Sequence, residues 1–323
     1  MIVRWGVASL SEVLAELSVA RPMLISTQRW SHLHLPVAKS FYGALPHAEI
    51  TGVKAAIASL GDADGLVALG GGSAIDTAKA VSKETGLPVV SIPTTYSGAE
   101  WTHFFGVRDA AANTKSAGAG AKTVGIVYDE HLTLDLSPFD TCGAAMNALA
   151  HCAEALSAPG RSDETDGEAL RGAGLISAWL PKVLDDGRDL EARRHLLEGA
   201  MHGGAALRAG MGLGHAMAQA LGGGFGLPHG PMNAVCLPHA LRFNREAAAG
   251  PLALLAEAMG VSDPAARSAE LGGLACPMRL RDYDVPRDGL PAIAEKTAER
   301  PAAKANPRPA SAAEILTLLQ EAW

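Results

Sequence analysis

The chain has 323 residues, of which 48% are hydrophobic and 19% charged, and its formal net charge is -7. This length and apolar content predict two domains, because a single core rarely grows beyond about 250–300 residues. The Lys and Arg residues are dispersed, which argues against nucleic acid as a partner. No window approaches the ~20 apolar residues that span a bilayer, and the start lacks a signal-peptide pattern, so we expect a cytoplasmic protein without a membrane partner.

The four cysteines are far apart in the sequence, and none belongs to a C-x-x-C pair of the kind that holds zinc or performs redox chemistry. They are Cys142, Cys152, Cys236 and Cys276. We expect four buried, reduced thiols.

The first part of the chain alternates short apolar runs with helical segments. Predicted strands cover residues 23–26, 65–69, 88–92 and 123–127. Such alternation is typical of a parallel sheet with helices on both faces. We therefore predict an α/β, doubly wound (Rossmann-like) nucleotide-binding domain over residues 1–137.

After residue 138 the strand signals stop and the second domain, residues 138–323, is predicted to be all-helical. Apolar residues recur at helical spacing in residues 143–157, 168–183, 191–207 and 211–221. Three prolines make residues 300–309 a predicted loop before a last helix at 312–323. Because Ala and Gly are abundant, we expect the helices to pack through small side chains.

A glycine-rich turn joins the predicted strand at 65–69 to the helix that follows it. Gly70, Gly71 and Gly72 allow a phosphate to approach the backbone, and the N–H groups of the helix start can hold a pyrophosphate. Ser73 is predicted to cap this helix. Asp76, in the first turn, fits a structural or ribose-side contact better than a phosphate contact. A plain tight connection is the alternative for the glycines.

A second polar turn follows the next predicted strand, at residues 92–100. It carries Thr94, Thr95 and Ser97. Ligands of open α/β sheets bind at the carboxyl ends of the strands, so these hydroxyls are predicted to complete a nucleotide cradle. The alternative is a turn whose side chains bond only to its own backbone.

The helical half carries two polar pairs at a spacing of four residues, Asn147 with His151 and His215 with Gln219, and each pair therefore shares one helix face. His229 stands among prolines and glycines at a predicted helix start. Three imidazoles could converge on a metal ion or on a substrate carbonyl. The alternative is that each histidine is a buried, hydrogen-bonded core residue.

These features, in this order, resemble the iron-containing alcohol dehydrogenase superfamily. The marks are the G-G-G-S-x-x-D-x-x-K turn at 70–79, P-T-T at 93–95, Asn147 with His151, and two histidines fourteen apart at His215 and His229. V-Y-D at 127–129 and N-P-R-P at 306–309 extend the resemblance over nearly the whole chain. It implies the dehydroquinate synthase-like fold of that family, NADH or NADPH as cofactor, and a homodimer.

The sequence M-N-A-L-A-H at 146–151 looks like the maleylacetate reductase branch, because metal-dependent members have Asp where this chain has Asn147. The implied ligand set for Fe, Zn or Mn is Asn147, His151, His215 and His229. An amide oxygen is a weaker ligand than a carboxylate, so the site is expected to bind metal poorly or to work without it.

The resemblance implies hydride transfer to the conjugated C=C of maleylacetate or a related small oxo-acid, giving a 3-oxoadipate-type product in aromatic-compound degradation. His151, His215 and His229 are the catalytic candidates for enolate stabilisation and proton transfer, with His215 and His229 preferred. Carboxylate-binding candidates are Lys115, Lys122, Arg208 and Arg308. Among these, Lys115 is preferred, and it is also a candidate for the cofactor site.

Two departures keep other functions open. The branch usually has His at the position of Gln219, and an acidic, His-containing segment at residues 230–233, which read Gly-Pro-Met-Asn here. A metal-dependent short-chain alcohol dehydrogenase or aldehyde reductase is one alternative. A catalytically silent nucleotide-binding relative is the other. No acidic residue follows the first predicted strand at 27–29, so both NADH and NADPH are expected to be accepted.

Overall fold

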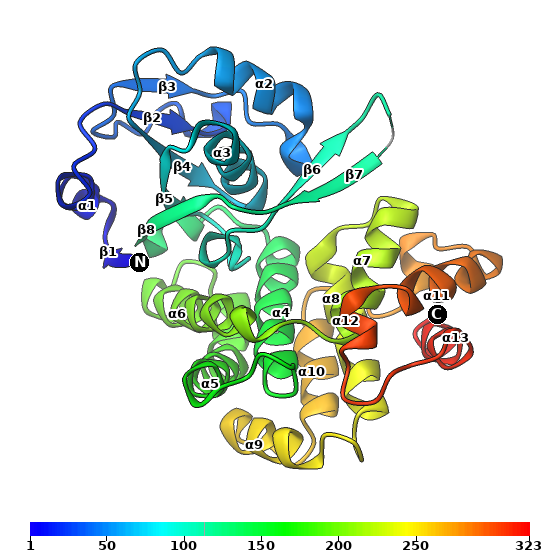
Figure 1. The fold of residues 1–323 in the computed structure, drawn as a ribbon. Helices are drawn as coiled ribbons and strands as arrows, with labels where there is room; N and C mark the ends of the chain where they lie inside the picture. The colour runs from blue at the N-terminus through cyan, green and yellow to red at the C-terminus, as the bar shows by residue number, and fades with distance from the viewer. Residues whose placement is uncertain (113) are drawn as a thin grey trace. The chain divides into compact units, whose positions relative to one another are not determined.

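The computed structural model describes residues 1–112 and 114–323, with the side chains of residues 114 and 115 outside the description. The chain divides into two compact units, which we call unit 1, Met1–Leu134, and unit 2, Asp135–Trp323 (Figure 1). Each unit is described by itself below.

Unit 1 is built on a six-stranded parallel sheet in the order β1-β8-β5-β4-β2-β3. The strands are β1 (Ile2–Trp5), β2 (Pro22–Ile25), β3 (Lys39–Phe41), β4 (Gly65–Gly70), β5 (Pro88–Pro93) and β8 (Lys122–Tyr128). The predicted strands correspond to β2, β4, β5 and β8, which confirms the doubly wound fold. The sequence did not reveal β1 and β3, which are short strands at the two edges of the sheet.

Helices cover both faces of this sheet because its central strands are apolar on both sides. Along β4, Leu66 and Ala68 join a core with α2 (Ile50–Ala58) and α3 (Gly72–Thr85). Val67 and Leu69 point the other way, into a core with α1 (Leu10–Glu16). Side chains alternate along a strand, so the continuous apolar run of β4 supplies both cores.

An antiparallel hairpin, β6 (Phe105–Asp109) with β7 (Thr114–Gly118), forms a separate two-stranded sheet in unit 1. It was not expected from the sequence. The backbone N–H of Gly106 donates to Asp76 Oδ2 at 3.0 Å, which ties the hairpin to α3.

Unit 2 is helical within the residues that the structure describes. Its helices are α4 (Pro138–Ala155), α5 (Asp163–Asp185), α6 (Leu190–Ala206), α7 (Leu213–Phe225), α8 (His229–Phe243), α9 (Ala249–Met259), α10 (Pro264–Gly273), α11 (Leu290–Ala298), α12 (Pro301–Lys304) and α13 (Ala312–Glu321). The four predicted helical segments correspond to α4–α7. The helix α4 begins earlier than predicted because the Ser137 hydroxyl accepts from the Asp140 N–H and Pro138 fits the first helical position.

The prediction of an uninterrupted loop at residues 300–309 was wrong, since α12 lies inside it. Pro301 occupies the first position of α12, where its missing N–H costs no hydrogen bond. The last helix, α13, begins at Ala312 as predicted, with Ser311 and Glu314 forming a capping box.

Small residues set the spacing of α4, α5 and α6, as the composition suggested. A Cβ built at Gly172 of α5 would lie 2.7 Å from Cys152 Sγ and 3.0 Å from the carbonyl oxygen of Gly199. A Cβ at Gly203 of α6 would lie 2.8 Å from the carbonyl oxygen of Ala148 on α4. The three helix backbones therefore approach each other where no side chain intervenes. The helices α5 and α6 fix the position of α4 through these contacts at Ala148 and Cys152.

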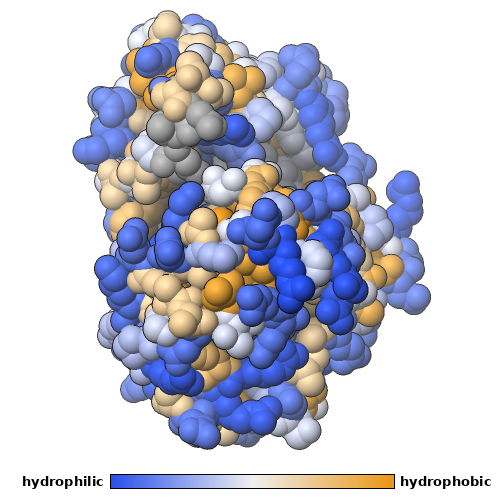
Figure 2. All heavy atoms as spheres, turned by 90° about the vertical axis from the view of Figure 1, so that its right-hand side faces the viewer, coloured by the Kyte–Doolittle hydropathy of each residue, from blue (hydrophilic) through white to orange (hydrophobic). Residues whose placement is uncertain are grey.

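On the face drawn in Figure 2, hydrophilic side chains predominate and hydrophobic ones lie among them. No helix within the described residues is both long enough and apolar enough to cross a membrane. The four cysteines are buried free thiols, as expected.

The packing of α5 predicts a contrast between two glycines of the same helix. Gly172→Ala should lower the free energy of unfolding by about 1–3 kcal/mol, because the new methyl group meets backbone atoms that cannot move aside. Gly167→Ala is the control, since nothing lies within 4 Å of its Cβ position, and it should leave stability unchanged or raise it by about 0.5–1 kcal/mol. Urea unfolding measures both, and equal effects would contradict this packing.

Candidate active site

The glycine turn between β4 and α3 leaves room only for a backbone. Gly70 has φ +147°, a conformation that favours glycine, and a Cβ there would lie 2.8 Å from Ala74 Cβ. A Cβ at Gly71 would lie 2.9 Å from Thr95 Cγ2, whereas nothing lies within 4 Å of the Cβ position of Gly72. The first N–H groups of α3 have no acceptor within the helix, so this turn suits a phosphate.

The polar turn after β5 adjoins the glycine turn. The Thr94 N–H donates to the carbonyl oxygen of Gly70 at 3.1 Å. Thr95 Oγ1 is buried and has no hydrogen-bond partner within the described residues. Ser97 lies in the same turn, four residues after the end of β5 at Pro93. A glycine backbone beside an unsatisfied hydroxyl fits the pyrophosphate of a dinucleotide.

Two residues of the glycine motif have structural contacts. The prediction that Ser73 caps α3 was wrong, because Gly71 is the N-cap and Ser73 Oγ instead accepts from the His47 N–H at 3.0 Å. Asp76 accepts from Gly106 on β6, so the structural contact considered for it is present. The predicted role of Lys115 concerns a side chain outside the described residues.

Lys79 completes the motif as a fully buried cation. Its Nζ donates to the Ala99 and Phe104 carbonyl oxygens and lies 3.5 Å from Asp76 Oδ1. Burial lowers the pKa of Lys79, while Asp76 and Glu100 act in the opposite direction. The ammonium therefore organises the backbone that follows the polar turn.

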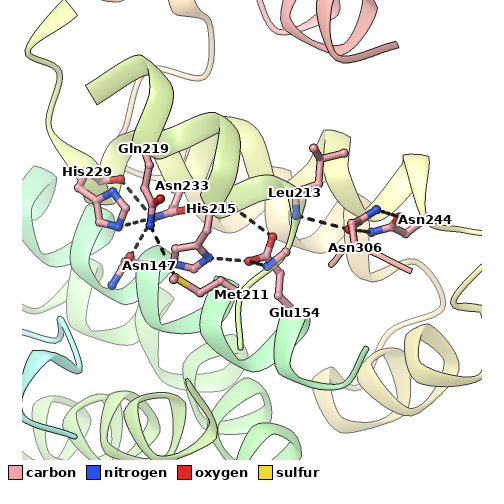
Figure 3. A network of polar contacts seen from close by, with 11 residues as sticks. Asn147, Glu154, Met211, Leu213, His215, Gln219, His229, Asn233, Asn244 and Asn306 are labelled. Atoms are coloured by element: carbon pink, nitrogen blue, oxygen red, sulfur yellow. Dashed lines mark hydrogen bonds and ion pairs between the residues drawn. The ribbon is translucent and has the colours of Figure 1, made fainter. Parts of the chain in front are cut away.

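In unit 2, α4, α7 and α8 bring the predicted polar residues together (Figure 3). The rings of His151 and His215 stack with centroids 4.7 Å apart, and those of His215 and His229 lie 5.7 Å apart. Asn147 lies one turn before His151 on α4. These four residues form what we call the histidine cluster.

Glu154, one turn beyond His151 on α4, fixes the ring of His215. Its Oε2 accepts from His215 Nδ1 at 2.6 Å and from the Gly212 N–H at 2.8 Å, and its Oε1 accepts from the His215 N–H at 3.2 Å (Figure 3). Because a carboxylate accepts, the proton on this side belongs to Nδ1. His215 Nε2 is buried and has no hydrogen-bond partner within the described residues.

Asn233 of α8 links Asn147 on α4 to His229 at the start of α8. Its Nδ2 donates to Asn147 Oδ1 at 2.8 Å and lies 3.2 Å from His229 Nε2. His229 Nε2 is therefore an acceptor in this arrangement. Asn147 is held by a neutral amide partner.

His151 is a neutral base at ordinary pH. Its side chain is buried, with Nδ1 lacking a hydrogen-bond partner within the described residues. Burial lowers the pKa of His151 well below its usual value, and the charges of His215 and His229 lower it further. A positive charge in the cluster is thus disfavoured at His151.

The donor set of the cluster does not fit a tightly held divalent cation. Asn147 Oδ1 is already an acceptor for Asn233, and the ring planes of His151 and His215 differ by only 11°, so their lone pairs do not converge on one point. The Glu154 carboxylate bonds to the far nitrogen of His215. Among the described residues, no group of three or more His, Cys, Asp or Glu side chains is arranged to hold a metal ion.

The other predicted cations bind carboxylates at the surface or lie exposed. Arg208 Nη2 is 3.1 Å from Glu164 Oε1, and Arg308 pairs with Glu314. Lys122 is exposed on β8.

Sequence analysis missed three residues. Glu154 and Asn233 follow His151 and His229 by three and four residues, so the spacing rule used for Asn147 and His151 would have found them. Arg300, whose Nη1 donates to Gln219 Oε1 at 3.0 Å, gave no local signal.

Sequence models of one protein family match segments of both units. The sequence model of iron-containing alcohol dehydrogenase matches residues 6–127, and that of the C-terminal part of the Fe-containing alcohol dehydrogenase family matches residues 141–323. The chain is 39% identical to a maleylacetate reductase of Burkholderia cepacia over 81% of this chain and 74% of the relative. It is 31% identical to that of Pseudomonas knackmussii over 98% and 93%. The crystal structure of a maleylacetate reductase from a Rhizobium species superposes with a TM-score of 0.92, at 30% identity, over 100% of this chain and 95% of that one.

The Glu154 contacts predict that this carboxylate positions His215. Both carboxylate oxygens of Glu154 accept from N–H donors in the wild type. In Glu154→Gln, the new NH2 group faces at least one of these donors and cannot accept from it, so the His215 ring loses its fixed orientation. We expect turnover to fall about 10- to 100-fold while cofactor affinity stays unchanged. The control Glu168→Gln alters another carboxylate–imidazole pair, with His202, and should leave turnover unchanged. Steady-state kinetics that show equal activity for both variants would refute the positioning role.

Proposed function

The chain belongs to the iron-containing alcohol dehydrogenase family and is an NAD(P)-dependent oxidoreductase, and from this premise we propose that it reduces the conjugated C=C of maleylacetate, or of a related oxo-acid, to a 3-oxoadipate-type product. Members of the family use NAD(P)H with iron or another divalent metal ion. The likeness to maleylacetate reductases, and a cluster in which Asn147 and His151 are uncharged, favour the proposed reaction.

The single observation that carries the proposal is the state of the cluster, in which Asn147 and His151 are uncharged and His215 is held by Glu154. Reduction of an enone requires a hydride at the carbon β to the ketone and a proton at the α carbon. The bound dihydronicotinamide supplies the hydride. The protein must stabilise the enolate oxygen and deliver the proton, for which a metal is not required.

His215 is the proposed proton donor. Its Nδ1 proton is committed to Glu154, so Nε2 is the atom that can hold the transferred proton. The Glu154 carboxylate balances the positive charge of the ring when both nitrogens are protonated. Because His215 is fully buried, bulk water does not compete for this proton.

His151 and His229 are the proposed hydrogen-bonding partners of the developing enolate. His151 stacks on His215, and its Nδ1 is unsatisfied among the described residues, so a substrate oxygen could engage one ring without displacing an existing contact. His229 is fixed by Asn233. Asn147 then serves to orient the α8 side of the cluster through Asn233 and not as a metal ligand.

In unit 1, the paired turns at residues 70–73 and 94–97 are proposed to hold the pyrophosphate of NADH or NADPH. The narrow space at Gly70 and Gly71 and the unsatisfied Thr95 hydroxyl support this assignment. Asp76 is then a structural residue of the cofactor domain.

The substrate is a small molecule, as in other enzymes of this family. A homodimer and a cytoplasmic location are further parts of the proposal. The homodimer rests on the family resemblance, and the location rests on the sequence patterns described above.

The competing mechanism places a divalent metal among Asn147, His151, His215 and His229, as in a metal-dependent alcohol dehydrogenase or aldehyde reductase. The observation that favours it is the proximity of three imidazole rings. The two mechanisms respond in opposite ways to one charge change, since a carboxylate at position 147 improves a metal site and does not help a proton donor.

Two substitutions test the proposal, with NAD(P)H oxidation by maleylacetate and by a panel of oxo-acids and aldehydes as the assay. His215→Ala should lower kcat by roughly 10²- to 10⁴-fold, the range for a lost proton transfer. Asn147→Asp should strengthen metal binding without raising turnover. His202→Ala, which removes an imidazole that pairs with Glu168, is the control and should keep full activity.

Chelator treatment completes this test, and the wild-type protein should stay active after it. A wild type that loses all activity on chelation, together with an Asn147→Asp variant whose turnover rises only when Zn²⁺ or Fe²⁺ is added, would establish the metal mechanism instead. Failure to oxidise NAD(P)H with every oxo-acid and aldehyde of the panel would refute the proposed function.

A further inference from the structure

Arg300 places a cation next to α7, the helix that carries His215. It is the N-cap residue of α12, and its Nη1 donates to Gln219 Oε1 at 3.0 Å. Gln219 follows His215 by four residues, so both side chains leave α7 on the same face. A guanidinium is thus anchored one helical turn from the proposed proton donor.

Gln219 is held from its other end. Its Nε2 contacts Met211 Sδ at 3.7 Å (Figure 3). The amide oxygen at the other end of the group accepts from Arg300. A neutral amide orients the guanidinium without neutralising it. A glutamate at position 219 would orient it equally well and would cancel its charge.

The charge of Arg300 is not balanced by a carboxylate within the described residues, unlike that of several other arginines of unit 2. Arg161, Arg208, Arg267 and Arg308 each pair with an acidic side chain. Arg300 Nε is buried and has no hydrogen-bond partner among the described residues. Burial lowers the pKa of the Arg300 guanidinium below its usual value.

A partly buried, unpaired cation is costly for a folded protein unless an anion compensates it. Arginine also presents a planar fork of donors that matches the two oxygens of a carboxylate. Gln219 occupies only one of these donors in the described contacts. Arg300 is thus oriented by Gln219 and keeps donors for an anion, as expected of a preorganised anion-binding site.

We propose that Arg300, oriented by Gln219, forms a carboxylate-binding subsite that selects dicarboxylate substrates over neutral ones. The nature of the substrate rests on the proposed function, because maleylacetate carries a carboxylate at each end of its enone. The subsite itself rests on the contacts of Arg300 and can be tested without turnover.

Adipate is the probe, because it has the length and both carboxylates of the product but no reactive group. Its affinity for the full-length, NADH-loaded protein is measured by calorimetry. Arg300→Gln should weaken adipate binding at least tenfold, or about 1.4 kcal/mol. Arg300→Lys keeps the charge and loses the planar fork, so its adipate affinity should lie between those of the wild type and Arg300→Gln. Dimethyl adipate, which has no charge, should not distinguish the variants.

Arg245→Gln is the matched control, since it makes the same charge change at an exposed ion pair with Asp263, and it should bind adipate like the wild type. Arg300→Gln should also melt no lower than the wild type, because it removes an uncompensated charge. A purely structural Arg300 would instead lower the melting temperature and leave adipate affinity unchanged. If Arg300→Gln does not fold, Gln219→Leu replaces it and should also weaken adipate binding.

Equal adipate affinity of the wild type and Arg300→Gln, or no adipate binding by the wild type, overturns the subsite. If adipate binding follows Arg300 but maleylacetate is not reduced, the proposed function fails and the subsite stands. If maleylacetate is reduced with the same KM by both proteins and adipate affinity is equal, the subsite fails and the proposed function stands.

Discussion

The contact between Glu154 and His215 is the interaction on which the site depends. The carboxylate receives the ring nitrogen of His215 and two backbone N–H groups at the start of α7, so a single side chain of α4 sets both the position of that helix and the state of its imidazole. His151 stacks on the ring that Glu154 holds, and His229 packs against it. The close contacts of Gly172 on α5 and Gly203 on α6 fix the position of α4, the helix that carries this carboxylate.

The neutral groups Asn147, Asn233 and His151 lie around this carboxylate–imidazole pair, and their lack of charge favours proton transfer over binding of a metal ion. Asn147 and Asn233 bond to one another, and burial keeps His151 uncharged. The Glu154 carboxylate is already engaged by His215 Nδ1 and by two backbone N–H groups. A cation therefore gains little in the cluster, whereas an enolate oxygen can accept hydrogen bonds from imidazoles. The unpaired charge of Arg300 then has an evident complement in the carboxylates of a dianionic substrate.

Sequence patterns predicted the sheet and the helical second half because these elements depend on local periodicity. The buried runs at β4 and β5 and the four-residue spacing of Asn147 and His151 are visible in the chain itself. The capping role of Ser73 was wrong because tertiary contact with His47 competed for its hydroxyl. Arg300 could not be found, since its partner Gln219 lies 81 residues away and only the fold brings them together. The hairpin β6–β7 likewise has a contact distant in sequence, the hydrogen bond from the Gly106 N–H to Asp76.

The destination of the hydride in the product tests the central claim most directly. Maleylacetate is to be reduced with NADH deuterated at C4, on each face in turn, and the product analysed by NMR. Enone reduction assisted by His215 predicts an intact ketone and one deuterium on the carbon β to it, which is the former alkene carbon that bears a carboxylate. The other former alkene carbon, α to the ketone, should carry a solvent-derived hydrogen. Deuterium on a carbinol carbon would contradict the account, because it would mean that the carbonyl is reduced as in an alcohol dehydrogenase.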